Sequence, residues 1–174
     1  MDTLISIGQQ APLFELPDLN GAIHRLESMR GKVLILNFWS AECPWSEKAD
    51  REVLSLLSDF SSDLALWSIA SNANEPIDLL KQAASSRSLP VVLHDKDQTA
   101  ADLYGALTTP HFFVVDRKGA LRYQGALNDI TFRQREPTMN YLRPAVEALF
   151  SGVHPNPSKT SPYGCTIVRY TADS

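Results

Sequence analysis

Cys43 is the residue of this sequence that is best placed to perform chemistry. It follows an apolar run, residues 33–39, by four positions, and it precedes a segment, residues 46–60, in which apolar residues recur at helical spacing. Unpaired N–H groups and the positive end of a helix dipole stabilise a thiolate at such a position, and they lower its pKa from about 8.5 into a range of roughly 3.5–7.5. A free cysteine is more often a small buried apolar residue, but the placement of Cys43 favours a reactive thiolate.

The segments that position Cys43 predict an α/β fold. Residues 33–39 and 64–70 are nearly continuous apolar runs, which are typical of strands covered on both faces. Helical spacing alternates with these runs, which predicts a parallel βαβ unit, and a later hairpin adds antiparallel strands to the same sheet. We therefore expect a central mixed β-sheet with helices on both faces. The other predicted elements are an N-terminal β-hairpin within residues 8–27, helices at 76–83, 100–104 and 141–150, an extended segment at 90–94, and hairpin strands at 112–116 and 121–125.

The length of 174 residues suits one domain with a single sizeable core, which we place at residues 1–152. Residues 153–174 begin with a proline-rich stretch and are expected to form an extended C-terminal tail that packs on or near the domain. Residues 166–170 have β character, so we expect them either to add an edge strand or to pack over the domain.

Composition argues against several classes of function. The net charge is −4 without a run of like charges, so neither a nucleic-acid surface nor a membrane surface is expected. No stretch has the roughly 18 apolar residues that a membrane span needs. The first six residues lack the regions of a secretory signal, so a cytoplasmic location is expected unless a segment ahead of Met1 directs export. Two cysteines are too few for a disulfide scaffold, and without a Cys/His cluster no metal site is expected.

Residues 40–46 are Ser-Ala-Glu-Cys-Pro-Trp-Ser, and residues 108–110 are Thr-Thr-Pro. These linked motifs resemble those of the thioredoxin-like redoxin family, which includes AhpC/TSA peroxiredoxins and thioredoxin-like thiol-disulfide oxidoreductases. The first motif falls where those proteins carry their reactive cysteine, and the second resembles the family's cis-proline loop, which faces that cysteine. The other similar segments are residues 8–16, Asn20-Gly21, residues 31–39, residues 116–119 and residues 123–125, and residues 163–167 resemble the tail of one peroxiredoxin-like subgroup.

This resemblance covers residues 8 to about 150, and it implies a thioredoxin-like fold. It also implies no bound cofactor and an external thiol reductant, such as thioredoxin or a low-molecular-weight thiol. The groove beside Cys43 would receive a disulfide, thiol or hydroperoxide substrate. Its expected lining is Pro110, Thr109, Trp45, Ser46 and Ser40.

The sequence departs from the thioredoxin pattern at two positions. A thioredoxin-type site needs a second cysteine three residues after the first, because that thiol releases the substrate from the mixed disulfide. Ser46 occupies this position, where it either hydrogen-bonds the Cys43 thiolate or is a plain residue at a helix start. Asn37 stands where thioredoxins place a buried carboxylate for proton transfer.

Only half of the peroxiredoxin motif is present. Ser40 fits the position of the hydroxyl residue, three before Cys43, but Leu36 replaces the proline. Arg122 could supply the cation that stabilises thiolate and peroxide, although a surface arginine is the more ordinary interpretation.

Cys165 is the second cysteine, and it lies in the tail. A mobile tail could bring it to Cys43, since a disulfide needs Cα atoms within about 7 Å. Cys165 would then resolve a sulfenate or a mixed disulfide at Cys43. The alternatives are a structural cysteine packed under the tail and an unpaired exposed thiol.

Three residues near the expected groove have their own alternatives. Trp45 either presents an apolar surface to a partner or caps the helix start against the domain. His111 is expected to be a solvated loop histidine rather than an acid–base group. Pro110 is expected to follow a cis peptide bond and to shape the groove rather than to react.

The residues together favour a redoxin-type thiol-disulfide oxidoreductase. In this hypothesis Cys43 attacks a disulfide or is oxidised, and Cys165 or an external thiol resolves it. Two alternatives stay open, namely a thiol peroxidase that reduces hydroperoxides and a non-catalytic binding module that kept the thioredoxin fold. The oligomeric state does not follow from the sequence.

Overall fold

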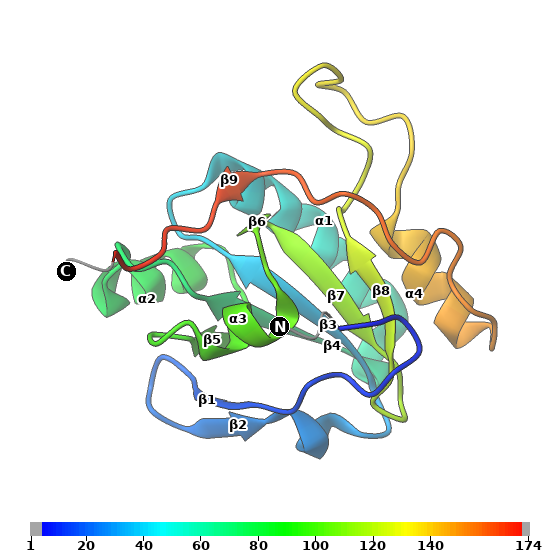
Figure 1. Cartoon of the computed structure of the whole chain (residues 1–174), viewed down its shortest axis with the longest axis horizontal. Helices are drawn as coiled ribbons and strands as arrows, with labels where there is room; N and C mark the ends of the chain where they lie inside the picture. The colour runs from blue at the N-terminus through cyan, green and yellow to red at the C-terminus, as the bar shows by residue number, and fades with distance from the viewer. Residues whose placement is uncertain (1–4, 172–174) are drawn as a thin grey trace.

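The computed structural model describes residues 5–171, and its centre is a five-stranded mixed sheet (Figure 1). The strands lie in the order β5-β4-β3-β7-β8. The first three are parallel to one another, whereas β7 is antiparallel to both β3 and β8. The predicted α/β class and mixed sheet are confirmed. The strand bounds are β3 Val33–Trp39, β4 Leu64–Ala70, β5 Val92–His94, β7 His111–Val115 and β8 Leu121–Gly125.

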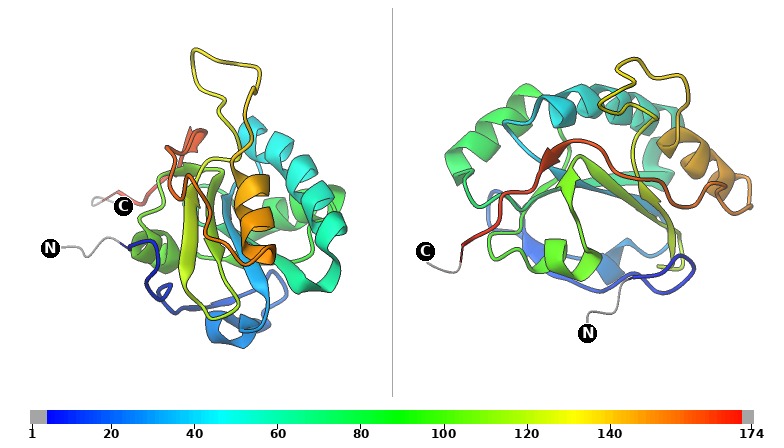
Figure 2. Two further views of the ribbon diagram at one scale, coloured as in Figure 1. Left: turned by 90° about the vertical axis from the view of Figure 1, so that its right-hand side faces the viewer. Right: turned by 45° about the horizontal axis from the view of Figure 1, so that its top comes forward.

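Helices cover both faces of this sheet, as the sequence predicts (Figure 2). The helices α1 (Pro44–Phe60), α2 (Ile77–Ser86) and α4 (Leu142–Phe150) pack on one face. The short helix α3 (Thr99–Tyr104) packs on the other. That second face is also covered by the N-terminal hairpin of β1 (Glu15–Pro17) and β2 (Ile23–Arg25), and the 3-10 helices η1 (Leu26–Met29) and η2 (Ser61–Asp63) complete the connections.

Strand β3 positions Cys43. All seven of its residues are buried, because the sheet is covered on both faces. Ile35 faces the core under α1 and α4, whereas its neighbours Leu34 and Leu36 face the core under α3. Four residues, 40–43, separate the carboxyl end of β3 from the start of α1. Cys43 therefore lies at the N-terminus of a 17-residue helix, at the sheet edge where open α/β folds bind ligands.

The C-terminal tail crosses the molecule at the edge of the sheet where β3 ends (Figure 1). Its strand β9 (Cys165–Thr166) pairs antiparallel with β6 (Thr108–Thr109) in a separate two-stranded sheet. Strand β9 thus packs over the domain and is not part of the central sheet, which the tail meets at one isolated bridge between Lys159 and Gln124 of β8. The domain boundary at residue 152 stays a prediction. Among the helices described, none has the length and apolar character to cross a bilayer, and the cytoplasmic location also stays a prediction.

Candidate active site around two cysteines

Cys43 lies beneath the loop that the cis-proline forms. Cys43 is only 3% exposed. The Thr109–Pro110 peptide bond is cis, as the resemblance implies. In the thiol form, Sγ of Cys43 donates a hydrogen bond to the carbonyl oxygen of Thr109 at 3.1 Å. Three of the predicted residues, Cys43, Thr109 and Pro110, are therefore brought together.

The pairing of β9 with β6 brings the second cysteine to the same place. Cys165 lies opposite Thr109 in this antiparallel pair, and the two thiols are close enough for each to shift the pKa of the other. Gly164 permits this approach, because a Cβ atom there would lie 2.1 Å from the Thr109 carbonyl oxygen. The structure records both cysteines as free thiols.

The surroundings of the two thiols move their pKa values in opposite directions. Burial raises the pKa of the Cys43 thiol, but hydrogen bonds from the Cys165 thiol and from the Ser46 backbone N–H outweigh burial, so the pKa is lowered overall. Burial, together with the hydrogen bond to Cys43 and the charge on that sulfur, raises the pKa of Cys165 to about 12. The two shifts therefore favour ionisation of Cys43 before Cys165.

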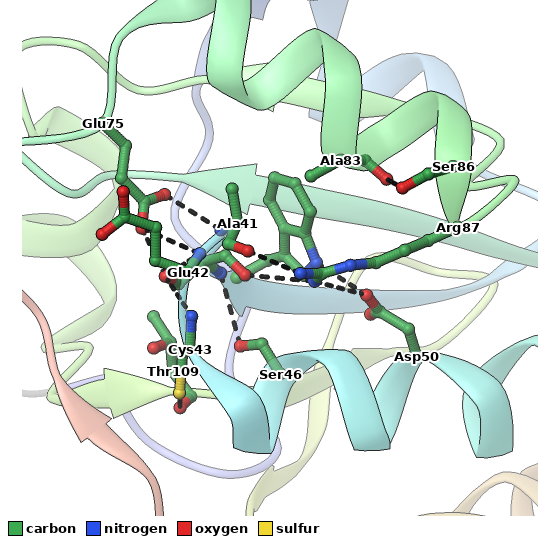
Figure 3. Close-up of polar contacts among 12 residues, drawn as sticks. Ala41, Glu42, Cys43, Ser46, Asp50, Glu75, Ala83, Ser86, Arg87 and Thr109 are labelled. Atoms are coloured by element: carbon green, nitrogen blue, oxygen red, sulfur yellow. Dashed lines mark hydrogen bonds and ion pairs between the residues drawn. The ribbon is translucent and has the colours of Figure 1, made fainter.

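Glu75 organises the loop between β3 and α1, although sequence reasoning did not identify it (Figure 3). This buried carboxylate accepts hydrogen bonds from the Ala41 N–H at 3.0 Å, from the Glu42 N–H at 3.3 Å and from the Ser40 hydroxyl. The Ser40 oxygen in turn accepts from the backbone N–H of Cys43 at 3.1 Å. Ser40 thus orients the backbone of the cysteine loop, and its hydroxyl proton points to Glu75.

A buried ion pair supports the same loop from the other side (Figure 3). Arg87 donates to the carbonyl oxygens of Ser40 at 3.2 Å and Ala41 at 2.5 Å, and to Oδ2 of Asp50 at 3.2 Å. Asp50 also accepts from the indole N–H of Trp39 at 2.8 Å. Burial raises the pKa of Asp50 to about 6. The loop before Cys43 therefore has its N–H groups bound by Glu75 and its carbonyls bound by Arg87.

Ser46 and Trp45 both lie in the first turn of α1, and they differ in burial. Ser46 is fully buried, and its hydroxyl oxygen accepts from the Ser40 N–H at 3.3 Å, so its side chain braces the loop while its backbone faces Cys43. Trp45 is half-buried, and its ring meets that of Tyr163 from the tail at 5.2 Å between centroids. Both rings line a mainly apolar groove with Pro110 and Ile130. Trp45 thus forms one part of the groove wall, and Tyr163 from the tail forms another.

Three further residues considered from the sequence, Arg122, Asn37 and His111, are not part of the contacts described around the two thiols. Arg122 forms an ion pair with Asp116 at 2.8 Å. Asn37 is buried within β3, and neither atom of its side-chain amide has a hydrogen-bond partner among the described residues. The expectation of a solvated His111 is wrong. His111 is buried in β7, accepts from the Leu107 N–H at 3.2 Å, and has its pKa lowered by burial to about 4.

Within residues 5–171, no group of three or more His, Cys, Asp or Glu side chains is arranged to hold a metal ion.

The chain is similar to known thioredoxin-like proteins. The thiol-disulfide oxidoreductase ResA of Geobacillus thermodenitrificans (strain NG80-2) is 32% identical over 124 residues, which are 69% of this chain and 69% of that protein. The thioredoxin-like protein YneN of Bacillus subtilis (strain 168) is 27% identical over 121 residues, or 68% of this chain and 70% of that protein.

Two solved structures match nearly the whole chain, including the tail. A hypothetical protein from Sinorhizobium meliloti 1021 has a TM-score of 0.85 at 28% identity, and the match covers 98% of this chain and 97% of that one. An uncharacterized conserved protein from Geobacillus kaustophilus has the same TM-score and identity, with 98% and 95% covered. The profile of the AhpC/TSA family matches residues 7–124. Because this match spans more than half of the sequence, the chain belongs to the AhpC/TSA family and has a thioredoxin-like fold.

Proposed function

We propose that the protein is a thiol-disulfide oxidoreductase of the thioredoxin-like type, and that Cys43 and Cys165 form its redox pair. The observation that carries this proposal is the pairing of β9 with β6, which places Cys165 opposite Thr109, the residue whose carbonyl oxygen accepts from the Cys43 thiol. The similarity to ResA, which is named a thiol-disulfide oxidoreductase, supports the same activity. Cys165 thus supplies the second thiol that is absent at Ser46.

In the proposed cycle the Cys43 thiolate attacks one sulfur of a substrate disulfide, and the other sulfur leaves as a thiolate that takes up a proton. Cys165 then loses its proton and attacks the Cys43 sulfur of the mixed disulfide, which expels the second half of the substrate as a thiol. The substrate has gained two electrons and two protons, and the protein holds a Cys43–Cys165 disulfide. An external thiol reductant, either thioredoxin or a low-molecular-weight thiol, returns both residues to thiols.

The opposite pKa shifts fit this order of events. Apart from burial, the Cys165 pKa is raised by its hydrogen bond to Cys43 and by the negative charge on that sulfur. Both causes disappear once Cys43 is bonded to a substrate sulfur. The pKa of Cys165 therefore falls when its thiolate is needed, and Cys165 stays a thiol until then.

The geometry supports disulfide exchange better than a peroxidase reaction. A peroxidase of the kind considered from the sequence would direct the Ser40 hydroxyl and an arginine toward the thiolate and the peroxide. Here the Ser40 hydroxyl donates to Glu75, and Arg122 is bound to Asp116. We expect reduced protein to react with hydrogen peroxide no faster than a free thiol does.

The test is to equilibrate the full chain in glutathione buffers of graded redox potential, quench with acid and N-ethylmaleimide, and map the peptides without reduction. We expect a Cys43–Cys165 disulfide in the wild type and a stable glutathione adduct at Cys43 in Cys165→Ser. Reduction of a model disulfide should be lost in Cys43→Ser.

If the wild type and Cys165→Ser both accumulated the same glutathione adduct at Cys43, Cys165 would not be the resolving thiol. If Cys43→Ser left every redox activity unchanged, the binding-module alternative would replace the oxidoreductase.

A further inference from the structure

Asn72 joins the C-terminal tail to the carboxylate that organises the Cys43 loop. Its Oδ1 accepts from the backbone N–H of Val168 at 2.7 Å, and its Nδ2 donates to Oε2 of Glu75 at 3.2 Å. Glu75 accepts hydrogen bonds from the backbone N–H groups of Ala41 and Glu42, the two residues that directly precede Cys43. Val168 lies three residues after Cys165. One side-chain amide and one carboxylate therefore connect the segments that carry the two sulfurs.

We propose that Asn72 and Glu75 are positioning residues for the redox pair, and that together they set the distance and orientation of Cys165 relative to Cys43. This inference rests on the proposed redox pair and deepens it. Neither residue touches a sulfur in this arrangement. They act through the two backbone segments that they bind.

The environment of Glu75 suits a positioning role. The residue is 6% exposed, and its carboxylate accepts from neutral donors, namely two backbone N–H groups, the Ser40 hydroxyl and the Asn72 amide. A buried carboxylate with several neutral donors holds them in fixed directions, because hydrogen bonds to an ionised acceptor are short and strong. The Glu75 charge also contributes to raising the pKa of Cys165, after burial and the effects of Cys43. The same carboxylate thus helps to keep Cys165 protonated while Cys43 is the thiolate.

The contribution of Asn72 is limited by neighbouring contacts. The Val168 carbonyl also accepts from the Ala73 N–H at 2.9 Å and from the Gln98 side chain at 2.8 Å. Removal of the Asn72 side chain therefore loosens the tail without releasing it. One lost hydrogen bond of this kind corresponds to about a ten-fold change in an equilibrium.

The decisive measurement is the ratio of the Cys43–Cys165 disulfide to the dithiol at a fixed glutathione buffer, which reports how well the two thiols are aligned. We expect Asn72→Ala to lower this ratio about ten-fold, whereas the exposed neighbour Asn74→Ala leaves it unchanged. Glu75→Gln keeps one acceptor oxygen of two and should lower the ratio by a similar factor. A residue that only stabilised the fold would change the unfolding free energy and leave this ratio unaltered.

A double-mutant cycle tests whether the two residues act as one unit. We expect Asn72→Ala combined with Glu75→Gln to lower the ratio little more than the larger single effect, because either change breaks the same connection. Fully additive effects, or an Asn72→Ala ratio within about two-fold of the wild type, would overturn the proposal. If Glu75→Gln failed to fold, the comparison of Asn72→Ala with Asn74→Ala alone decides.

A second measurement separates this inference from the proposed redox pair. In fully reduced protein, alkylation of Cys43 by a maleimide should be about ten-fold faster in Asn72→Ala than in Asn74→Ala, because the loosened tail uncovers the thiol. Faster alkylation in a protein that never forms the disulfide would support the positioning role and refute the redox pair. Equal alkylation rates would refute the positioning role whether or not the disulfide forms.

Discussion

Cys165 lies directly opposite Thr109 in the antiparallel pair of β9 with β6. The carbonyl oxygen of Thr109 accepts from the Cys43 thiol at 3.1 Å, so this short pair places a tail cysteine against a helix N-terminus. In the full sequence the two cysteines are 122 positions apart. A thioredoxin-like fold without a second thiol at Ser46 thus gains one from the opposite end of the chain.

The pKa of Cys43 should depend on the thiol of Cys165. Replacing Cys165 with alanine removes the thiol that donates to the Cys43 sulfur, so the pKa of Cys43 should rise. Cys165→Ser keeps a hydroxyl donor and should retain most of the lowered value. The measurement is the pH dependence of iodoacetamide alkylation or of thiolate absorbance. An unchanged pKa in Cys165→Ala would mean that the helix N-terminus and backbone alone set it.

Gly164 should be required for disulfide formation. A Cβ atom at this position would lie 2.1 Å from the Thr109 carbonyl oxygen and 2.7 Å from its carbonyl carbon, so alanine must displace the tail. We expect Gly164→Ala to slow closure of the Cys43–Cys165 disulfide by about 10- to 100-fold, since small displacements of reacting groups have effects of this size. Ser161→Ala, at an exposed tail position, is the matched control. The rate is measured by quenching the oxidation at successive times and mapping the peptides. Equal rates in both variants would refute the requirement for glycine at position 164.

The central part of the site could be predicted from sequence because local patterns determine it. The apolar run of β3 and the helical spacing after Pro44 place Cys43 at a helix start, and the motif around Pro110 places the cis-proline loop by resemblance. These features depend on residues that are close together in the chain. Hydrophobic periodicity and turn residues therefore carry them.

The residues that hold the Cys43 loop in place are distant from it in the sequence, so hydrophobic periodicity does not reveal their contacts. Glu75 and Arg87 follow Ala41 by 34 and 46 positions. Each looks like an ordinary surface charge in the sequence, since charged residues are seldom buried without a partner. The prediction for His111 is wrong for a local reason: the proline before it indicates a loop, whereas the structure places His111 in β7. The two-residue strands β6 and β9 are also too short to show an alternating pattern.

Arg87 should contribute strongly to stability. Its guanidinium neutralises the buried Asp50 carboxylate and binds two carbonyls of the cysteine loop. Arg87→Ala leaves that carboxylate without its counter-ion, which should lower the unfolding free energy by about 3 kcal/mol. The exposed Arg51→Ala on α1 should change it by less than about 0.5 kcal/mol. Urea unfolding followed by tryptophan fluorescence measures both, and a loss for Arg87→Ala as small as that of the control would contradict the role of the ion pair.

Asp50 should make stability depend on pH in a specific direction. Burial raises its pKa from 3.8 to about 6, so between these values the folded protein holds a proton that the unfolded chain has released. The unfolded state then binds fewer protons, and stability falls as pH rises through this window and is constant above it. A shift of this size corresponds to about 3 kcal/mol. We therefore expect the wild type to lose about 3 kcal/mol relative to Asp50→Asn between pH 4 and pH 7.

This difference isolates Asp50 from other titrating groups. The lowered pKa of His111, which also results from burial, makes stability rise with pH over nearly the same range, so the wild type alone would show a partly cancelled slope. Because His111 is present in both proteins, its effect drops out of the comparison. Urea unfolding of the two proteins at closely spaced pH values gives the difference. A flat difference across the window would mean that Arg87 keeps Asp50 ionised at a normal pKa, and the carboxylate would then be a permanent anchor of the loop rather than a titrating one.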